Sequence, residues 1–402
     1  MAALAGIRVI ELAHIMSGPT AGMLLADLGA DVIKVEKIPG GDDTRRFTPP
    51  EVNGEASAFM MMNRNKRGIA LDLKQSAACD ALHRLIDVAD VVIENFRVGT
   101  LDKLGLGYEV LRRTNPALIY CAISGYGRTG PDANKGGFDL VAQGLSGLMR
   151  ITGEPGGPPT KVGSPVTDIN AGILAALGIV AAYVHRLRTG QGQLVDTSLL
   201  EAGVMQTFWQ SAIFLGSGKQ IGPLGSAHPL TAPYQAFATQ DGWITIGASN
   251  QSNYERLTQV LEAPELLADE RFRDNASRMA NLRALVELIA LRFKRRPSSE
   301  WLAALAAVGV PAGPVLTIAE MLEHPQVLAR DMVVETTHPK AGKVRAIGCP
   351  VKLSETPARV SRAAPLFGQH TREVLEQVGL TTTEIDGLIQ TRAAIQSPVG
   401  AD

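Results

Sequence analysis

The stretch that decides the fold runs from Ile7 to Glu36 and reads IRVIELAHIMSGPTAGMLLADLGADVIKVE. Its apolar ends, residues 7–12 and 31–36, are predicted strands, and residues 20–28 between them are a predicted helix that stops at Gly29. A strand, a helix and a second strand in this order form a βαβ unit with parallel strands. The chain therefore opens with a unit typical of doubly wound α/β domains.

The same alternation continues through the first half of the chain. Further strands are predicted at 69–73, 91–95, 118–124 and 193–198, with helices at 76–88, 170–188 and 200–215. The helix at 170–188 follows a Gly/Pro-rich loop and is apolar nearly all round, so we expect it to be buried on every side. This pattern predicts an α/β fold with a Rossmann-like, mostly parallel sheet that has helices on both faces.

A turn-rich stretch, residues 216–229, indicates a domain boundary. Beyond it, a hairpin is predicted around Asp241-Gly242, and amphipathic helices are predicted at 254–261, 282–293 and 299–308. The tail adds a hairpin near 339–342 and a helix near 371–378. We expect a large domain whose N-terminal part is 1–215, a small α/β domain at 225–325, and a C-terminal part at 326–402.

Composition excludes several classes of protein. The 402 residues are 45% hydrophobic and 20% charged, as in globular proteins, and 39 basic residues balance 40 acidic ones. Without a basic excess, nucleic acid is not an expected partner. The N-terminus has no basic leader and the most apolar window, 173–184, is shorter than a membrane helix, so no membrane contact is expected. Three scattered cysteines without a C-x-x-C pair favour the reduced cytoplasm.

Motifs for common cofactors are missing. Ala13-His-Ile-Met-Ser-Gly-Pro19 follows the first strand where a dinucleotide-binding chain has G-x-G-x-x-G, so NAD and FAD are not favoured. No G-x-S-x-G or H-E-x-x-H occurs, and the seven histidines lack the spacing of metal ligands. We therefore expect neither a metal nor a tightly bound cofactor.

One carboxylate stands in an unusual place. Asp168 ends the run Gly163-Ser-Pro-Val-Thr-Asp168, where a Gly/Pro-rich loop enters the apolar helix. Asp168 can be an N-cap that accepts a hydrogen bond from the first turn. Alternatively, the helix dipole keeps it ionised while apolar neighbours strip its water, which makes a carboxylate a better nucleophile toward an acyl carbon. Both interpretations remain open from the residues alone.

Two further stretches are candidate ligand contacts. The glycines of Lys135-Gly-Gly-Phe-Asp139 would let the backbone approach a ligand, although such a run is also an ordinary loop. Lys37 and Asn63-Arg-Asn-Lys-Arg67 follow the strands of the opening region, where they can hold phosphates or form a solvated charged face.

Taken together, these motifs form a family pattern. Five stretches carry it and the tail adds a sixth: Gly18-Pro19 with Asp27-Leu-Gly-Ala-Asp-Val-Ile-Lys-Val-Glu36, Asn65-Lys-Arg67 with Leu71-Asp-Leu-Lys74, Glu94-Asn-Phe96, Gly125-Tyr-Gly127 through Gly137-Phe-Asp139, Pro165-Val-Thr-Asp168, and Leu366-Phe-Gly-Gln-His-Thr371. Along nearly its whole length the sequence resembles the class III CoA-transferases, the group of formyl-CoA transferase and the carnitine-type enzymes.

The resemblance implies a catalytic role for Asp168, which would attack an acyl-CoA thioester and pass through acyl-aspartyl anhydride and aspartyl-CoA thioester intermediates. Acyl-CoA is then a substrate. The resemblance also implies an interlocked homodimer in which the large domain joins both chain ends. The CoA contacts it implies are Ile15, Met16, Ser17, Lys37, Leu71, Lys74, Asn95, Phe96, Lys103 and Leu104.

A sister group with the same fold, the α-methylacyl-CoA racemases, pairs the aspartate with a histidine because moving an α-proton needs an acid and a base. This chain has Phe138 at the matching place, which favours transfer over racemisation. A racemase-type isomerase stays the alternative from another class of enzyme, and an acyl-CoA-binding protein without turnover is a third hypothesis.

The resemblance also suggests a branch. The tetraglycine loop of formyl-CoA transferase is absent, and Leu224-Gly-Ser-Ala-His-Pro229 stands near its place. This loop, with residues 232–237 and 146–153, looks similar to the succinyl-CoA:hydroxymethylglutarate branch, so we expect succinyl-CoA as the donor and a C5-type dicarboxylic acid as the acceptor. Arg150, Lys161 or His228 would bind the distal carboxylate. The expected substrate contacts are Phe138, Asp139, Arg150, Lys161 and His228.

Overall fold

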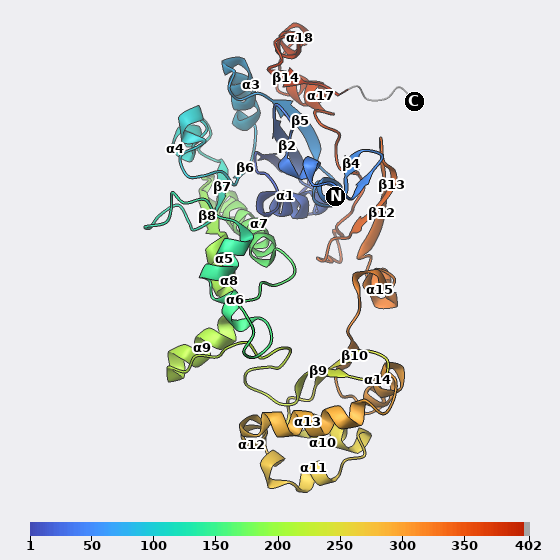
Figure 1. Cartoon of the computed structure of the whole chain (residues 1–402). Coiled ribbons are helices and arrows are strands. Elements are labelled where there is room, and N and C mark those ends of the chain that lie inside the picture. The colour runs from blue at the N-terminus through green and yellow to red at the C-terminus, as the bar shows by residue number, and fades with distance from the viewer. Residues whose placement is uncertain (398–402) are drawn as a thin grey trace. The chain divides into compact units, whose positions relative to one another are not determined.

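The computed structural model describes residues 1–397 and divides the chain into two compact units (Figure 1). The large unit comprises Met1–Ser146, Gly163–Gln206 and the chain from Pro325 onward; the small unit comprises Gly147–Val162 and Thr207–His324. These bounds differ from the predicted segments 1–215, 225–325 and 326–402, because residues 147–162 and 207–224 belong to the small unit. A backbone hydrogen bond of 2.8 Å from Gly225, directly after the second stretch, to the Gly153 carbonyl of the first fastens the two together.

A seven-stranded sheet organises the large unit in the order β14-β5-β2-β1-β6-β7-β8. All neighbours pair in parallel except β14, which runs antiparallel to β5. The six parallel strands have the doubly wound order, which reverses between β1 and β6. The predicted α/β class with a mostly parallel sheet is confirmed. The strands are β1 (Arg8–Glu11), β2 (Asp31–Lys37), β5 (Arg67–Leu71), β6 (Val91–Glu94), β7 (Ile119–Ser124), β8 (Leu194–Ser198) and β14 (Ala394–Ile395).

Helices cover both faces of this sheet because side chains alternate along each strand. On β1, Ile10 packs into one core cluster with α3, while Val9 packs into the other cluster with α7. The first face carries α3 (Ser76–Asp87), α4 (Tyr108–Thr114), α17 (Thr371–Glu376) and α18 (Thr382–Gln390). The second face carries α1 (Ser17–Asp27), α5 (Asp139–Leu145), α7 (Val166–Thr189) and α8 (Leu199–Met205). The remaining elements of the large unit are α2 (Ser57–Met62), α16 (Pro325–Ala329), β3 (Glu51–Val52), β4 (Glu55–Ala56), β12 (Val333–His338) and β13 (Gly342–Ile347).

The long helix α7 departs from its prediction in two ways. It begins at Val166, four residues before the predicted start, so Asp168 lies inside its first turn. It is also buried on one face only: Ala171, Ala175 and Ile179 are buried, whereas the opposite side chains are exposed, namely Ile173, Leu177, Val180, Val184 and Leu187. The prediction of a helix buried on every side is therefore wrong for this chain.

Length and composition would also allow α7 to cross a membrane, and among the described residues it is the one such helix. A core helix of a globular domain passes the same test, and α7 packs its small residues on α1 and the sheet. The predicted helix 200–215 is likewise interrupted, because α8 ends at Met205 and α9 (Phe208–Ser217) starts anew.

Gly172 allows α7 and α1 to lie side by side (Figure 1). A Cβ atom at Gly172 of α7 would lie 2.5 Å from the carbonyl oxygen of Ser17 and 2.7 Å from the Cβ of Thr20, both in α1. Real Cβ atoms do not approach so closely, so only glycine permits this crossing. The crossing brings the first turns of α7 next to the first residues of α1.

Buried charges fix the loop between β1 and α1. The ammonium group of Lys34 lies 3.0 Å from Glu11 and 2.8 Å from Asp42, and that of Lys66 lies 2.8 Å from Glu11. All four side chains are inaccessible to solvent. Asp42 also accepts the backbone N–H of Ile15, whose φ of 66° is in the left-handed region. A buried charge is tolerated only when paired, so this network holds one conformation of the loop.

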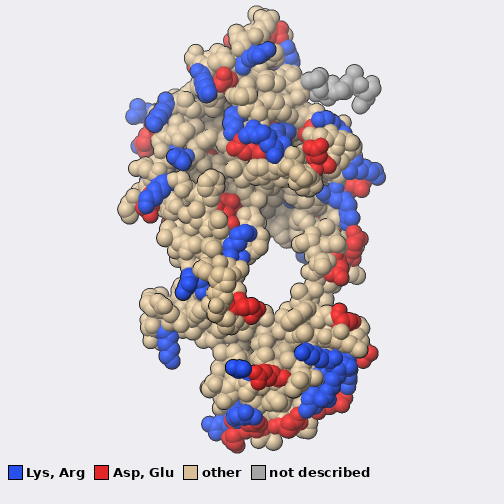
Figure 2. Space-filling model, viewed as in Figure 1, with Lys and Arg blue, Asp and Glu red and all other residues tan. Residues whose placement is uncertain are grey.

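The small unit has its own antiparallel sheet of three strands, β9 (Tyr234–Ala238), β10 (Trp243–Gly247) and β11 (Ala312–Pro314). The predicted hairpin around Asp241-Gly242 is the β9–β10 pair. Phe237, Phe293 and Trp301 stack in its separate core. Its helices are α6 (Leu148–Ile151), α9, α10 (Gln251–Val260), α11 (Glu265–Ala268), α12 (Asn275–Ala280), α13 (Leu282–Phe293), α14 (Ser298–Ala307) and α15 (Ile318–Leu322). Figure 2 shows acidic and basic side chains interspersed on the visible surface of each unit.

Replacing Glu11 by alanine should strongly destabilise the protein, because Lys34 and Lys66 would lose their shared buried anion. We expect urea denaturation to give a free energy of unfolding lower by about 3–5 kcal/mol. The control is Glu109→Ala, which removes an exposed partner of Arg112 and should change that free energy by less than about 1 kcal/mol. Equal effects of the two substitutions would contradict the role of the network.

Candidate active site

A cavity of about 360 Å³ opens at the carboxyl ends of β1, β2, β5 and β6. This is the edge, next to the strand-order reversal, where doubly wound sheets bind their ligands. Most of the lining is apolar, and Lys37 and Lys74 are exposed basic residues among it. The lining residues are Leu12, His14, Val35, Glu36, Lys37, Ile38, Pro39, Leu71, Asp72, Leu73, Lys74, Phe96, Thr100, Leu101 and Leu104. Five predicted CoA contacts are among them: Lys37, Leu71, Lys74, Phe96 and Leu104.

The other five predicted contacts do not line the cavity but lie in segments next to it. Asn95 fastens the loop after β1: its side chain donates to the His14 carbonyl at 2.8 Å and accepts the His14 N–H at 2.8 Å. Ser17 begins α1, and its hydroxyl lies 3.4 Å from the Asn95 amide nitrogen. Ile15 and Met16 belong to the same loop, and Lys103 lies in the short 3₁₀ helix Asp102–Leu104.

His14 is a cavity residue that the sequence interpretation missed. Its ring forms an edge-to-face pair with the Phe96 ring, with centroids 5.0 Å apart, and its Nδ1 atom has no hydrogen-bond partner among residues 1–397. Burial, with the nearby charge of Lys34, lowers the pKa of His14 to about 4, so the imidazole is neutral at physiological pH. The sequence does hold one indication that His14 lies at the cavity, because His14 directly precedes the predicted contacts Ile15, Met16 and Ser17.

Asp168 is the third residue of α7, whose N-cap position is held by Pro165 without a side-chain cap. The N-cap interpretation of Asp168 is therefore wrong. Asp139 from α5 acts as the cap instead, because its carboxylate accepts the backbone N–H of Thr167 at 2.9 Å and the Thr167 hydroxyl at 2.8 Å. The carboxylate of Asp168 has no hydrogen-bond or ion-pair partner within residues 1–397.

Electrostatics make Asp168 unusual. Burial, and then the negative charge of Asp139, raise the pKa of Asp168 to about 7. The dipole of α7 favours the ionised form of this carboxylate, whereas loss of hydration and the charge of Asp139 favour the protonated form. Asp168 is therefore about half-ionised near pH 7, and its anion is poorly hydrated.

The glycine-rich loop before α5 serves chain packing. A Cβ atom at Gly137 would lie 2.4 Å from the Cα of Gly125, which follows β7. This approach places Asp139 at the start of α5, where its second oxygen accepts from Gln143 at 2.7 Å. Phe138, at the place of the racemase histidine, is 69% exposed. A phenyl ring cannot carry a proton, so no second acid or base faces solvent from this position.

Asp168 and the cavity loop share one edge of the large unit. Gly172, one turn after Asp168 on α7, touches the carbonyl of Ser17. Residues one turn apart lie on the same face of a helix, so Asp168 belongs to the face of α7 that packs on α1.

The three remaining predicted contacts, Arg150, Lys161 and His228, belong to the small unit, whereas Asp168 belongs to the large unit. Arg150 and Lys161 are exposed. The Nδ1 atom of His228 accepts the backbone N–H of Leu230 at 3.1 Å. In neutral imidazole the proton is then on Nε2, which makes His228 a hydrogen-bond donor.

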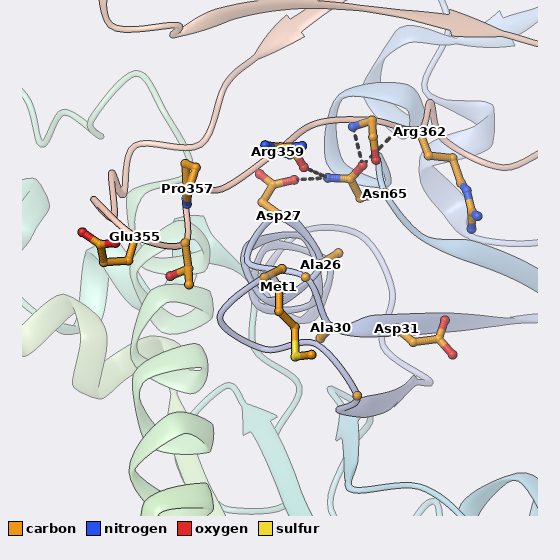
Figure 3. Close-up of a pocket in the computed structure, with 15 residues that line it drawn as sticks. Met1, Ala26, Asp27, Ala30, Asp31, Asn65, Glu355, Pro357, Arg359 and Arg362 are labelled. Atoms are coloured by element: carbon orange, nitrogen blue, oxygen red, sulfur yellow. Dashed lines mark hydrogen bonds between the residues drawn. The ribbon is translucent and has the colours of Figure 1, made fainter.

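A larger cavity, of about 550 Å³, lies at the opposite end of the sheet (Figure 3). Asn65 stands at its wall, donating to Asp27 at 2.8 Å and to the Arg359 carbonyl at 2.7 Å. No residue predicted for catalysis or CoA binding lines it. Its place at the amino ends of β1 and β2 is also not where doubly wound sheets bind ligands. Within the described chain, no group of three His, Cys, Asp or Glu side chains is arranged to hold a metal ion.

The large unit thus has a cavity at the carboxyl edge of its sheet and a partly buried carboxylate in the first turn of α7. Comparison with known families identifies the protein: CoA-transferase family III matches residues 4–371, and the chain belongs to this family. The protein is therefore a CoA-transferase, and the resemblance found in the sequence is confirmed.

Its relatives include enzymes named for dicarboxylates. The chain is 42% identical to the succinate–glutarate CoA-transferase of Agrobacterium fabrum over 93% of its length and 95% of that protein. It is 39% identical to the succinyl-CoA:glutarate CoA-transferase of Mus musculus, over 94% and 87%. It is 40% identical to the succinyl-CoA:mesaconate CoA-transferase of Haloarcula hispanica, over 95% and 98%.

Solved structures share the fold. A CAIB/BAIF family protein from Brucella suis superposes with a TM-score of 0.84 at 40% identity, covering 94% of this chain and 99% of the other. A protein from Mycobacterium tuberculosis gives a TM-score of 0.83 at 32% identity, covering 93% and 99%.

The raised pKa of Asp168 predicts an acidic limb in the pH–rate profile. An Asp168 nucleophile must be ionised, so kcat/KM should fall as pH drops below about 7. In Asp139→Asn the amide oxygen still caps Thr167 but the negative charge is gone, so the limb should move to lower pH. Asp132→Asn, in the loop before α5, is the control and should leave the limb in place. If the acidic limb of Asp139→Asn stays at the wild-type pH, the charge of Asp139 does not raise the pKa of Asp168.

Proposed function

We propose that this CoA-transferase moves CoA from succinyl-CoA to a C5-type dicarboxylic acid such as glutarate, itaconate or 3-hydroxy-3-methylglutarate. The observation that carries the chemistry is the partnerless, poorly hydrated carboxylate of Asp168 at the start of α7. The names of the glutarate and mesaconate relatives support the dicarboxylate acceptor.

The proposed reaction balances without an added reagent. A carboxylate oxygen of Asp168 bonds to the acyl carbon of succinyl-CoA, and CoA leaves as the thiolate, which gives a succinyl-aspartyl anhydride. The thiolate then attacks the aspartyl carbon and releases succinate, which leaves an aspartyl-CoA thioester. The acceptor carboxylate attacks the aspartyl carbon of this thioester, which breaks the C–S bond, releases the CoA thiolate again and forms a second anhydride. CoA thiolate finally attacks the acceptor's acyl carbon and restores Asp168.

The residues predicted to contact CoA match the chemistry of its apolar groups and of its phosphates. Apolar walls such as Leu71, Phe96 and Leu104 fit the adenine and pantetheine groups, and the ammonium groups of Lys37 and Lys74 fit phosphates. Phe138 and Asp139 of the large unit are proposed contacts of the acid substrate. The proposed cations or hydrogen-bond donors for its distal carboxylate belong to the small unit and are Arg150, Lys161 and His228.

Transfer is favoured over the two other hypotheses. An α-methylacyl-CoA racemase needs a second proton carrier, and Phe138 occupies that position. A binding protein without turnover would not need a carboxylate with a pKa of about 7 that lacks a hydrogen-bond or ion-pair partner in the described part of the chain.

The decisive assay is CoA exchange followed by mass spectrometry. The enzyme is mixed with succinyl-CoA and single mono- or dicarboxylic acids, without metal or nucleotide. We expect new acyl-CoA masses with C5-type dicarboxylates and none with Asp168→Ala, whose circular dichroism should match the wild type. Near wild-type turnover in Asp168→Ala would refute the mechanism, and equal rates with monocarboxylates would refute the acceptor class. Deuterium uptake at the α-carbon without any acceptor acid would instead identify an isomerase.

We also propose the interlocked homodimer that the family resemblance implies. The outward face of α7 supports it, because Ile173, Leu177 and Leu187 are 46%, 64% and 70% exposed. α9 adds Phe208 and Trp209, which are 65% and 57% exposed. So much exposed apolar surface is typical of a protein interface.

Sedimentation velocity checks this assembly. The wild type should sediment as a dimer, and Leu177→Glu should sediment as a folded monomer, because the interface would bury the new charge. Arg113→Glu, an exposed change on α4, is the control and should remain dimeric. A monomeric wild type, or a dimeric Leu177→Glu variant, would contradict the proposal.

A further inference from the structure

Residues 95–104, which we call the wall loop, follow β6, include the helix Asp102–Leu104 and form one wall of the cavity that we assign to CoA. Phe96, Thr100, Leu101 and Leu104 of the wall loop line this cavity. The wall loop also contains four of the ten predicted CoA contacts. A loop that must be ordered on binding costs affinity, so whatever fixes the wall loop in the free protein strengthens CoA binding.

The guanidinium of Arg128 lies between carboxylates at the two ends of the wall loop and donates a hydrogen bond to one of them, Glu94. Its Nη1 atom lies 3.2 Å from Oε1 of Glu94, and its Nη2 atom lies 4.0 Å from Oδ2 of Asp102. The other oxygen of Glu94 accepts the backbone N–H of Phe96 at 2.8 Å. Glu94 precedes the loop directly, and Asp102 starts its terminal 3₁₀ helix. One guanidinium thus bridges the beginning and the end of the wall loop.

The backbone of Arg128 is itself anchored to the sheet. Its N–H donates to Asp196 of β8 at 3.2 Å. The preceding residue, Gly127, has a φ of 94° and donates its N–H to the Ser124 hydroxyl at the end of β7 at 2.8 Å. A side chain cannot replace glycine at such a φ without strain. Arg128 therefore connects the wall loop, which follows β6, to the neighbouring strands β7 and β8 of the sheet.

Charge explains why an arginine is needed there. The side chain of Glu94 is only 5% exposed, and burial raises its pKa to about 7. Asp102 and Asp196 raise this pKa as well, whereas Arg128 lowers it. Without the guanidinium, Glu94 would be a buried carboxylate among like charges and a poor charged acceptor for the Phe96 N–H.

We propose that Arg128 is a positioning residue of the CoA site, which bridges Glu94 and Asp102 and thereby holds the wall loop in its CoA-binding shape. It acts through the loop and touches neither Asp168 nor the reacting carbon. This inference rests on the assignment of the cavity as the CoA site. It predicts that loss of Arg128 weakens binding of the CoA moiety and leaves the chemical steps unchanged.

The first test separates KM from kcat at pH 8, where Glu94 is mostly ionised. In Arg128→Gln, we expect KM for succinyl-CoA to rise about tenfold, the effect of one lost charge-assisted hydrogen bond, with kcat kept within about twofold. Arg128→Lys keeps the charge and should recover part of the affinity. The matched control is Arg113→Gln on the α4 surface, which should behave as the wild type.

A double-mutant cycle tests the bridge itself. If Glu94 and Arg128 act together, adding Glu94→Gln to Arg128→Gln should raise KM little beyond the stronger single substitution. If the two substitutions instead raise KM by independent factors that multiply in the double variant, the bridge between Glu94 and Arg128 is refuted. A fall in kcat with an unchanged KM would also overturn it. Circular dichroism and thermal unfolding of each variant confirm that the comparison uses folded protein.

Calorimetric titration with CoA itself distinguishes failure of this inference from failure of the proposed function, because it needs no turnover. Phe96→Ala reports on the cavity. If Phe96→Ala weakens CoA binding and Arg128→Gln does not, Arg128 is not a positioning residue. If Phe96→Ala leaves the affinity unchanged, the cavity is not the CoA site and the inference falls with it.

Discussion

The large unit depends on one buried electrostatic constraint: two inaccessible lysines, Lys34 and Lys66, share Glu11, and Lys34 also pairs with Asp42. Each charge is unfavourable alone in an apolar core, so all four must be present in one arrangement. That arrangement also fixes the loop after β1, because Lys34 donates to the Ala13 carbonyl at 2.9 Å and Asp42 accepts the N–H of Ile15. The loop carries three predicted CoA contacts and His14, so the buried charges set the shape of the cavity mouth.

The candidate nucleophile is prepared by the packing of neighbouring helices. Gly172 lets α7 approach α1, and Asp139 takes over the capping of the α7 N-terminus. Asp168 therefore does not cap the helix, and within residues 1–397 its poorly hydrated carboxylate has no partner. A carboxylate in this state lowers the stability of the folded protein at neutral pH, because its folded-state pKa of about 7 exceeds the usual value of 3.8. The folded protein loses stability relative to the unfolded chain as pH rises from 3.8 to about 7. This cost is the physical counterpart of its reactivity.

The proposed reaction separates recognition from chemistry. Residues of the wall loop and of the loop after β1 surround the cavity that we assign to CoA, while Asp168 lies on another helix that reaches the same edge. The side chains proposed for the distal carboxylate come from the small unit. Changes of acceptor acid in such an arrangement need not disturb either the cavity or the nucleophile, because specificity and catalysis use different residues.

The sequence by itself determined the α/β class, the strands of the opening βαβ unit and the family, because apolar periodicity and local motifs are properties of neighbouring residues. It also pointed to Asp168 through the loop before it. Tertiary structure alone decided that Asp139, 29 positions earlier, caps α7. It likewise decided that α7 has an exposed apolar face and that Arg128 reaches Glu94. These depend on contacts between residues distant in the chain, and no local pattern encodes which distant groups meet or how much water each one loses.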